Sequence, residues 1–535
     1  MVNPGVRAAL RVSGVLGIAA AIVVGAEYVP QEVELQGPSP RSAGGHDARN
    51  APVDRVAMVC PGPEQQGLAD AAVAEVDQRV EVEAMGAPSD VVEAALAAAE
   101  YRGVPPDLSQ GSIAVSPLGS RQGAIEAAAS VNERGVAART SFAGAQGGAA
   151  LALGGLAPGT SATQLFLGED DESLGLAVTP CVQAAEEAWL IAGGGASGRS
   201  ERLVLLNPGQ SPIAVSAQVW GSAQDPVGEV GDTGIALEPG ERQVLLVDAL
   251  APSGTAPVVH VVATGGPVSA YLGDRELEGT TEVGMELTGP VAAPGTSHVI
   301  PSVDLPAGQK RSASVRVAVA GADSAVVEIT AWGEEGAVPL TQDVTLVPGQ
   351  RSADIAITDL PPGTYALQIS SDEEIVASAV VSTEANAEGQ RDLSWAASVP
   401  AVTTLAGAPL PQPGQGRPVE YAITMVAPQG GDATVFTITE DGDLTSIDVD
   451  VDAGEVSRSD LGNAAGVWVV PGEGEVFASV QGHAEVTPST ADPDNAATTA
   501  RPAPGDERAV ALTSVLALTN LHLIRSVAAL RPTLP

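Results

Sequence analysis

From Arg202 onward, apolar residues come in short runs that alternate with polar residues and end at turn signals. In Val315–Val319 (VRVAV), valine occupies every second position, which is the period of a half-buried β-strand. Asn207-Pro208-Gly209 and Pro348-Gly349 separate such runs and favour tight turns. Short strands and turns in units of about 100 residues are typical of immunoglobulin-like β-sandwiches. The pattern therefore predicts a mainly β fold with tandem immunoglobulin-like β-sandwich domains.

One block of sequence occurs three times. Ala214–Gly221 (AVSAQVWG) and Ala325–Gly333 (AVVEITAWG) are the clear copies, and Ala433–Asp441 begins a weaker third copy. The copies lie roughly 110 residues apart, which is the length of a domain and not of a solenoid repeat. Trp220 and Trp332 hold the same place in the two clear copies, so we expect them to share a packing role in the repeat cores.

The repeats and the regions between them predict a series of domains. A less regular, β-rich domain with a short helix at Asp90–Tyr101 is expected first, followed by three β-sandwich repeats. The predicted boundaries are 53–195 for the first domain and 196–303, 304–402 and 415–527 for the repeats. Within the last repeat, residues 487–508 are low in complexity, which predicts a disordered loop.

The N-terminal region contains an apolar segment. Val12–Ala26 (VSGVLGIAAAIVVGA) carries no charge, and Arg7 and Arg11 precede it. Lengthened to begin near Ala8, the segment is just long enough to span a bilayer. Basic residues on the N-terminal side place that end in the cytoplasm. Residues 1–29 are therefore predicted to form a transmembrane helix, in a single-pass protein of the cytoplasmic membrane whose bulk lies outside.

A signal peptide is the alternative to an anchor. Val24-Gly25-Ala26 offers small residues for cleavage near Ala26, which would release a secreted protein. Residues 30–52 are rich in Pro, Gly, Ser and Ala and predict a flexible linker in both cases. Both alternatives place the domains outside the cytoplasm.

The charge of the chain excludes one class of partner. Asp and Glu number 66 against 25 Lys and Arg, which gives a net charge of −41. Nucleic acids are bound by clusters of Lys and Arg that neutralise phosphate, so we expect no nucleic-acid partner. Aromatic residues are only 3% of the chain, so aliphatic side chains must fill the cores.

The chain has two cysteines, Cys60 and Cys181. An even number of isolated cysteines in an exported chain indicates a disulfide, and two separate thiols are the alternative. No second cysteine or histidine lies close to either residue in sequence, which disfavours metal binding.

Two patterns imitate binding motifs. Gly193–Gly198 (GGGASG) matches the glycine pattern of a dinucleotide-binding motif. That motif requires a helix directly after the glycines, whereas Leu203–Leu206 has the pattern of a strand. Asp448–Asp452 (DVDVD) suggests calcium, but an EF-hand loop starting there would have Ala453 at its sixth position and Ser459 at its twelfth. The alternation instead predicts a half-buried strand, with Ile447, Val449 and Val451 facing inward.

Candidate catalytic chemistry is sparse. The histidines are too far apart in sequence for metal-ligand spacing, and no nucleophile has a plausible base near it. We therefore predict a protein that is not an enzyme, with no catalytic residue, no cofactor and no metal site.

Several short motifs resemble DUF5719, a family of actinobacterial envelope proteins of unknown function. They are Val59–Pro63 (VCPGP), Pro180-Cys181 followed by Trp189, Leu203–Gly209 (LVLLNPG), and the VWG-then-PG pattern of Val219–Gly240. The resemblance covers most of the chain after residue 55. It implies a membrane-anchored or secreted protein and brings no activity and no site residues.

These observations predict a non-catalytic scaffold or interaction protein of the cell envelope, whose tandem β-sandwiches dock protein partners through sheet edges and loops. The alternative is a binding module for cell-wall glycan or another envelope ligand, which predicts an aromatic or acidic groove. A hydrolase with a dispersed site in residues 53–195 is the third hypothesis. The partners are thus envelope proteins or cell-wall polymer, with the membrane contacted by the N-terminal helix.

Overall fold

The structure is a computed structural model. It describes residues 49–64, 78–118, 127–169, 173–194, 198–222, 233–251, 255–278, 281–307, 311–340, 344–357, 359–383, 391–414, 417–487 and 510–527. Residues 51–525 form one compact unit, and the second unit consists of residues 1–50 and 526–535. The fold described below is that of the first unit.

Three predicted features fall outside the described residues. They are the N-terminal helix, the linker up to residue 48, and the predicted loop from residue 488 onward. Among the residues that are described, no helix is both long enough and apolar enough to cross a membrane.

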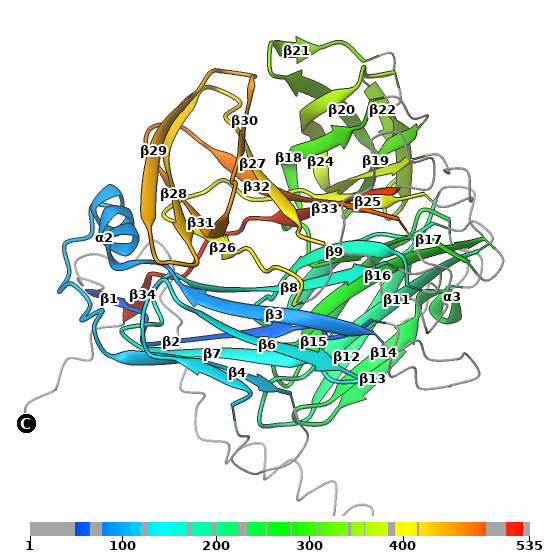
Figure 1. The fold of residues 1–535 in the computed structure, drawn as a ribbon. Helices are drawn as coiled ribbons and strands as arrows, with labels where there is room; N and C mark the ends of the chain where they lie inside the picture. The colour runs from blue at the N-terminus through cyan, green and yellow to red at the C-terminus, as the bar shows by residue number, and fades with distance from the viewer. Residues whose placement is uncertain are drawn as a thin grey trace, which may run out of the picture. The chain divides into compact units, whose positions relative to one another are not determined.

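The fold is mainly β, as predicted, and its strands form four successive segments (Figure 1). The first segment begins after the short strand β1 (Arg49–Pro52) and also contains the helix α2 (Ser89–Ala98), which lies where the sequence predicts a helix. Its strands are β2 (Arg55–Cys60), β3 (Arg79–Gly86), β4 (Gly111–Pro117), β5 (Ala129–Val131), β6 (Ala137–Ala143), β7 (Gly148–Gly154), β8 (Thr160–Gly168) and β9 (Gly175–Pro180).

The second segment contains eight strands and the single-turn helix α3 (Val247–Leu250). Its strands are β10 (Glu187–Ile191), β11 (Arg199–Leu206), β12 (Ile213–Trp220), β13 (Thr233–Leu237), β14 (Arg242–Leu246), β15 (Val258–Thr264), β16 (Ser269–Glu278) and β17 (Thr281–Thr288).

The third segment is built around one long strand, β24 (Gly363–Thr383). The first part of β24 pairs with β18 and β20, and its second part pairs with β19 and β25. One long strand therefore joins two groups of paired strands. The other strands are β18 (Gly295–Leu305), β19 (Arg311–Val319), β20 (Ala325–Gly333), β21 (Gly336–Val338), β22 (Val344–Val347), β23 (Ser352–Ala356) and β25 (Leu393–Ala397).

The fourth segment is followed by the short strand β34 (Ile524–Val527). Its strands are β26 (Ala406–Pro409), β27 (Glu420–Val426), β28 (Gly431–Thr439), β29 (Leu444–Val451), β30 (Val456–Asp460), β31 (Ala464–Pro471), β32 (Phe477–Val486) and β33 (Val510–Ala517).

The first, second and fourth segments share one strand order. In each, the first, sixth, third and fourth strands form one four-stranded sheet, and the fifth, second, seventh and eighth strands form another. The third segment follows the same order if β21 and β22, which both pair with β20, are counted together as its fourth strand and β24 is counted as both its sixth and its seventh. The strand order therefore repeats four times, and the region 53–195, which the sequence suggests is less regular, has the same order as the others.

Aliphatic side chains fill the space between the paired sheets. In the first segment, Val56 and Ile113 from one sheet and Val82 and Ala138 from the other belong to one buried cluster. In β33 buried and half-buried residues alternate strictly, which is the period that the sequence pattern predicts for a strand. This supports sandwich-like packing, while separate domains with the predicted boundaries stay a prediction because residues 51–525 form one compact unit.

One local prediction is wrong. Val451 is buried and Val449 packs against the core, but Ile447 is 67% exposed. β29 is the outermost strand of its sheet, and Ile447 lies outside the buried cluster that contains Val451. Alternation fixes which face a side chain points to, but it does not fix how far the opposite sheet extends.

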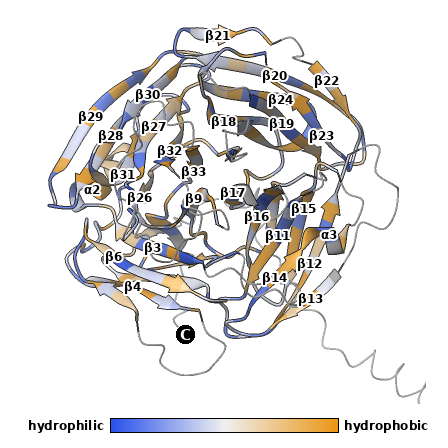
Figure 2. Ribbon diagram, turned by 45° about the vertical axis from the view of Figure 1, so that its right-hand side comes forward, coloured by the Kyte–Doolittle hydropathy of each residue, from blue (hydrophilic) through white to orange (hydrophobic). Residues whose placement is uncertain are grey.

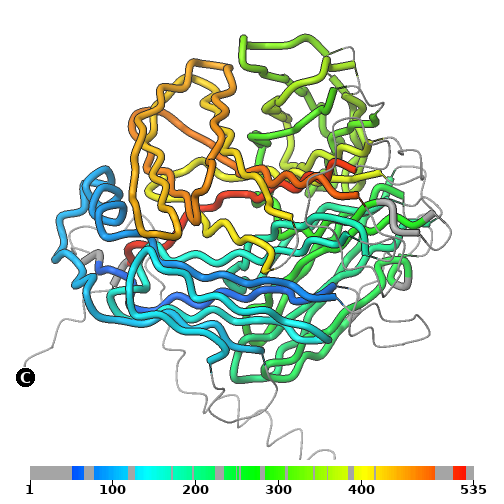
Figure 3. The backbone as a smooth tube through the Cα atoms, viewed as in Figure 1, coloured from blue at the N-terminus to red at the C-terminus, as the bar shows by residue number. Residues whose placement is uncertain are grey.

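The last strands of the four segments contact one another in a closed cycle. β9 contacts β17 and β33, and β25 contacts the same two strands. Figure 2 shows β9, β17 and β33 near one another, with the other sheets around them. Figure 3 traces β33, in red, past strands of the earlier segments. Strands that are hundreds of residues apart in sequence therefore meet at one place.

Candidate functional site

The Val59–Pro63 motif lies at the end of β2, where the first segment meets the second. A disulfide joins Cys60 to Cys181 across 121 residues of sequence, as predicted, with their Cα atoms 4.4 Å apart. Both cysteines are buried. The Gly62 N–H donates to Oε1 of Gln164 (2.8 Å), and Nε2 of Gln164 donates to the Gly62 carbonyl (3.2 Å). The motif is thus fixed from within its own segment.

The second segment holds the same motif from the other side. The Tyr271 hydroxyl donates to the Val59 carbonyl and accepts from the Val182 N–H (2.8 Å). Nε of Arg242 donates to the Pro61 carbonyl (2.7 Å). Burial lowers the pKa of Arg242 to about 10 and raises that of Tyr271. The side chains of Arg242 and Tyr271 thus hydrogen-bond to backbone groups of the first segment and join the two segments.

A buried ion pair completes this joint. Nη1 of Arg202, in β11, lies 3.1 Å from Oε2 of Glu64, and their side chains are only 4% and 1% exposed. Such a pair is strongly destabilising when one partner is lost, because the other charge is then buried alone.

The second and third segments are joined by Arg316 in β19. Its guanidinium binds both carboxylate oxygens of Asp354 (2.7 and 2.9 Å) and donates to the Gly193 carbonyl (2.7 Å). It also lies over the ring of Trp395, 5.0 Å from the ring centre, and Nε1 of Trp395 donates to Oδ2 of Asp274 (2.7 Å). Gly193, which begins the fingerprint-like sequence, thus serves as an acceptor in a joint between segments.

The central cycle of last strands contains buried polar groups. The Val178 N–H donates to Oγ of Ser514 (2.9 Å), and the Ser514 hydroxyl donates to Oε1 of Glu286 (3.0 Å). Beside this chain, the Thr513 N–H donates to Oδ2 of Asp392 (2.6 Å). Burial raises the pKa of both Glu286 and Asp392 well above their ordinary values, and the proximity of Asp392 adds to the effect on Glu286. Both carboxyl groups therefore retain a proton far above the pH at which exposed carboxyls lose it.

This shift predicts a pH effect on stability. Between the ordinary pKa of a glutamate and the raised pKa of Glu286, the unfolded chain is ionised while the folded chain holds the proton, so stability falls as pH rises. For one group the slope approaches about 1.4 kcal/mol per pH unit. We expect Glu286→Gln to raise the unfolding midpoint at pH 7 and to change it little at pH 4, where both states are protonated.

Denaturant unfolding at several pH values measures this effect. Glu328→Gln is the matched control, because Glu328 is exposed on β20. An equal gain for both variants at pH 7 would contradict the assignment to burial.

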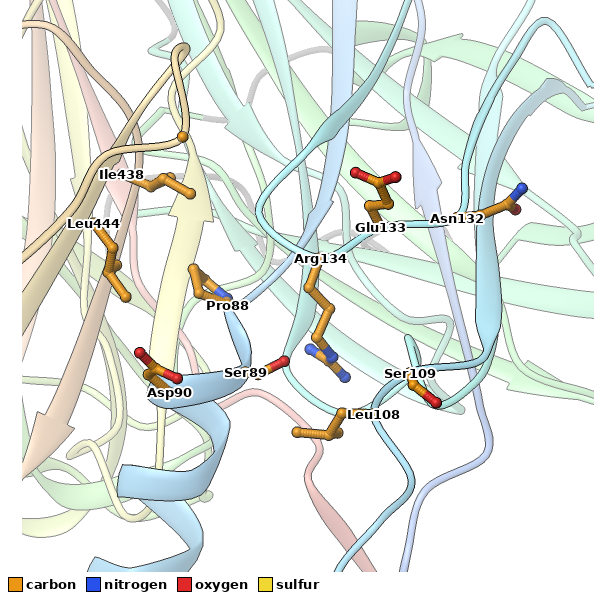
Figure 4. A pocket seen from close by; sticks show the side chains of 11 residues that line it. Pro88, Ser89, Asp90, Leu108, Ser109, Asn132, Glu133, Arg134, Ile438 and Leu444 are labelled. Carbon is orange, nitrogen blue, oxygen red and sulfur yellow. The ribbon is translucent and has the colours of Figure 1, made fainter.

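A first open cleft of about 410 Å³ lies between α2 and the β28–β29 turn (Figure 4). Ile438 and Leu444 line one side and Leu108 and Arg134 the other, with Ser89 and Asp90 at the start of the helix. Nη1 of Arg134 donates to the Ala87 carbonyl (2.6 Å). Two further carbonyls accept from its Nη2, and burial lowers the pKa of Arg134 to about 10. Its charge is thus used within the fold, and we assign no ligand to this cleft.

A second cleft of about 550 Å³ lies between the third and fourth segments. It adjoins an inner chamber of about 60 Å³, and both are lined by Asp304, His483 and Thr513. The cleft also carries Glu420 and Asp460, and the chamber carries Asp392 of the central cycle. None of these residues is identifiable from sequence spacing, because they are brought together from three separate regions of the chain.

The tryptophans of the repeat occupy corresponding places in the strand order with different neighbours. Trp220 ends β12 and lies edge-on to Trp189, with ring centres 4.9 Å apart. Trp332, in β20, packs against Val299 and Val426. Both are buried.

Within the described residues, no three His, Cys, Asp or Glu side chains are placed to hold a metal ion.

Comparisons with known proteins give a family and little more. No curated protein matches the chain. Among solved structures, Thermotoga maritima 1070 is 15% identical, with 20% of this chain and 95% of that chain covered and a TM-score of 0.18. The major pilin of Streptococcus pyogenes is 9% identical, with 43% and 99% covered and a TM-score of 0.12. Similarities this low carry no argument about fold or function.

The family model matches residues 136–419, and its description is a family of unknown function, DUF5719. The match includes the Leu203–Gly209 motif and both clear copies of the repeated block. Because it spans more than half of the 535 residues, the chain is a member of the DUF5719 family.

Proposed function

We propose that this chain is a non-catalytic interaction protein of the cell envelope, located outside the cytoplasm. Its four segments would act as immunoglobulin-like β-sandwich units that present sheet edges to envelope proteins. The Val59–Pro63 motif supports this role, because its Val59 and Pro61 carbonyls accept hydrogen bonds from Tyr271 and Arg242 and so join the first segment to the second. The buried disulfide supports a location outside the cytoplasm, where disulfides persist.

The observation that carries the proposal is an apolar patch at one sheet edge. Val326 of β20 and Val344 and Leu346 of β22 are 46%, 52% and 66% exposed. Val326 and Leu346 are direct cross-strand partners, so the patch is continuous across both strands. In the part of the chain that the structure describes, β22 pairs only with β20. Open edges with exposed aliphatic residues are sites where another chain adds a strand.

A photo-crosslinking residue at position 346, in cells that produce the full chain, tests this function. We expect defined adducts with an envelope protein from position 346 and none from position 104. Val104 is the matched control, because it is an equally apolar residue that is 82% exposed in a loop. The same adducts from both positions, or none from either, would exclude this edge as the docking surface.

A further inference from the structure

The inner chamber beside the second cleft has mostly apolar walls. Its volume of about 60 Å³ holds roughly two groups the size of a water molecule. The apolar side chains that line it come from four strands and from the residue after β18, and they are Val303, Pro306, Ala379, Val381, Ala396, Ala511 and Val515. A narrow aliphatic space of this kind accepts an unbranched chain more readily than a planar or branched group.

Three buried polar atoms at this site have no hydrogen-bond partner among the described residues. They are Oγ of Ser302 and Oδ1 of Asp392 in the chamber, and Nε2 of Gln481 in the cleft. Ser302, Asp392 and Gln481 are 0%, 3% and 5% exposed. Nearly all buried polar groups in folded proteins pair with protein, water or a ligand, so these three atoms are available to hydrogen-bond a ligand that enters the site.

The charges around the site favour a cation. Asp304, Glu420 and Asp460 line the cleft, and Arg458 is 3.0 Å from Asp460 and partly neutralises it. Three metal-binding side chains do not converge in this described region, which disfavours a divalent metal. A terminal methylene and ammonium are of a size that the chamber accepts.

We propose that this site binds a primary alkylammonium group on a ligand that also carries a carbonyl or hydroxyl oxygen. The ammonium donates to Oδ1 of Asp392 and Oγ of Ser302, and an ammonium has the donors for both. The methylenes contact Val381 and Ala396, and the ligand oxygen accepts from Nε2 of Gln481. This binding goes beyond the proposed function, because it uses no residue of the β20–β22 edge.

The protonation of Asp392 is consistent with this occupant. Burial raises its pKa well above the ordinary value when the site is empty, and a cation in contact favours the ionised form. A lysine side chain of a peptide and a small free amine share this chemistry, so the test includes both sources.

Titration calorimetry on the purified full chain tests the site. The probes are N-acetyl-lysine methylamide, its neutral isostere N-acetyl-norleucine methylamide, and a short peptide with one central lysine. We expect the lysine probes to bind and the norleucine probe not to bind. Tighter binding of the peptide identifies a protein source, and equal affinity identifies a small amine. Failure of both lysine probes to bind at millimolar concentration would overturn the proposal.

Variants locate the binding. Asp392→Asn removes the carboxyl group that ionises when the cation binds, and Ala511→Leu fills the chamber while keeping every polar group, so each is expected to weaken binding at least about tenfold. Asp323→Asn is the matched control, because it makes the same charge change at an exposed residue. Unfolding midpoints of all three show whether they are folded. Unchanged binding by the first two, or equal weakening by the control, would show that the chamber is not the site.

Discussion

Replacing Cys60 and Cys181 together by alanine is expected to lower the free energy of unfolding by about 4–5 kcal/mol. The disulfide closes a loop with a sequence separation of 121 residues, and the unfolded chain gains the most entropy when a loop of that length is released. The disulfide lies next to the Val59–Val182 backbone bridge, and the Val182 N–H donates to the hydroxyl of Tyr271 in the second segment. Loss of the disulfide is therefore also expected to loosen the contact between the first two segments.

Denaturant unfolding of the oxidised protein, the reduced protein and the double variant measures this effect. The reduced protein is the control, because it loses the bond and keeps both side chains. We expect the reduced protein and the variant to unfold at similar denaturant concentrations, well below that of the oxidised protein. A difference smaller than about 1 kcal/mol between oxidised and reduced protein would contradict the chain-entropy account.

Arg202→Met is expected to destabilise the protein by about 3–5 kcal/mol, because it leaves the Glu64 carboxylate buried without its partner. Removing both charges, with Glu64→Leu added, is expected to recover most of that loss, since an apolar pair of similar volume needs no solvation. The loss in the single variant would thus come from the orphaned charge and not from the missing attraction.

The exposed pair Arg458–Asp460 is a matched control for this prediction. Its atoms lie 3.0 Å apart, against 3.1 Å for Arg202–Glu64, but its side chains are 37% and 79% exposed. Arg458→Met should therefore cost no more than about 1 kcal/mol. Urea unfolding of the three variants compares two contacts of nearly equal length that differ in burial. Similar losses for Arg202→Met and Arg458→Met would show that burial does not govern the buried pair.

Strands were predictable from sequence because they leave a local pattern, and the disulfide was predictable because the chain has only two cysteines to pair. Alternation in Val315–Val319 and the turn at Asn207-Pro208-Gly209 depend on nearby residues. In the structure, Nδ2 of Asn207 donates to the Leu237 carbonyl (3.0 Å) and its Oδ1 accepts from the Gly209 N–H (2.8 Å), so the motif ties one turn to the next.

The fourfold strand order and the second cleft were not predictable in the same way. The first segment has the order of the others without the repeated block of sequence, because a strand order is set by pairing across the sheet and not by any one motif. Asp304, Asp392 and Gln481 lie on three different parts of the chain, and their proximity arises only when the third and fourth segments pack together. Spacing along the chain carries no signal for such a site.

The mutual contact of β9, β17, β25 and β33 also limits how this protein can change in evolution. A linear array of modules tolerates the gain or loss of a copy, since each module touches only its neighbours in sequence. Here the fourth segment also contacts the first, so a fifth segment would have no vacant position, and deletion of the fourth segment would leave Glu286 without its Ser514 partner. The copy number is therefore fixed by geometry, and relatives of this architecture should vary in their loops and termini and keep the number of modules.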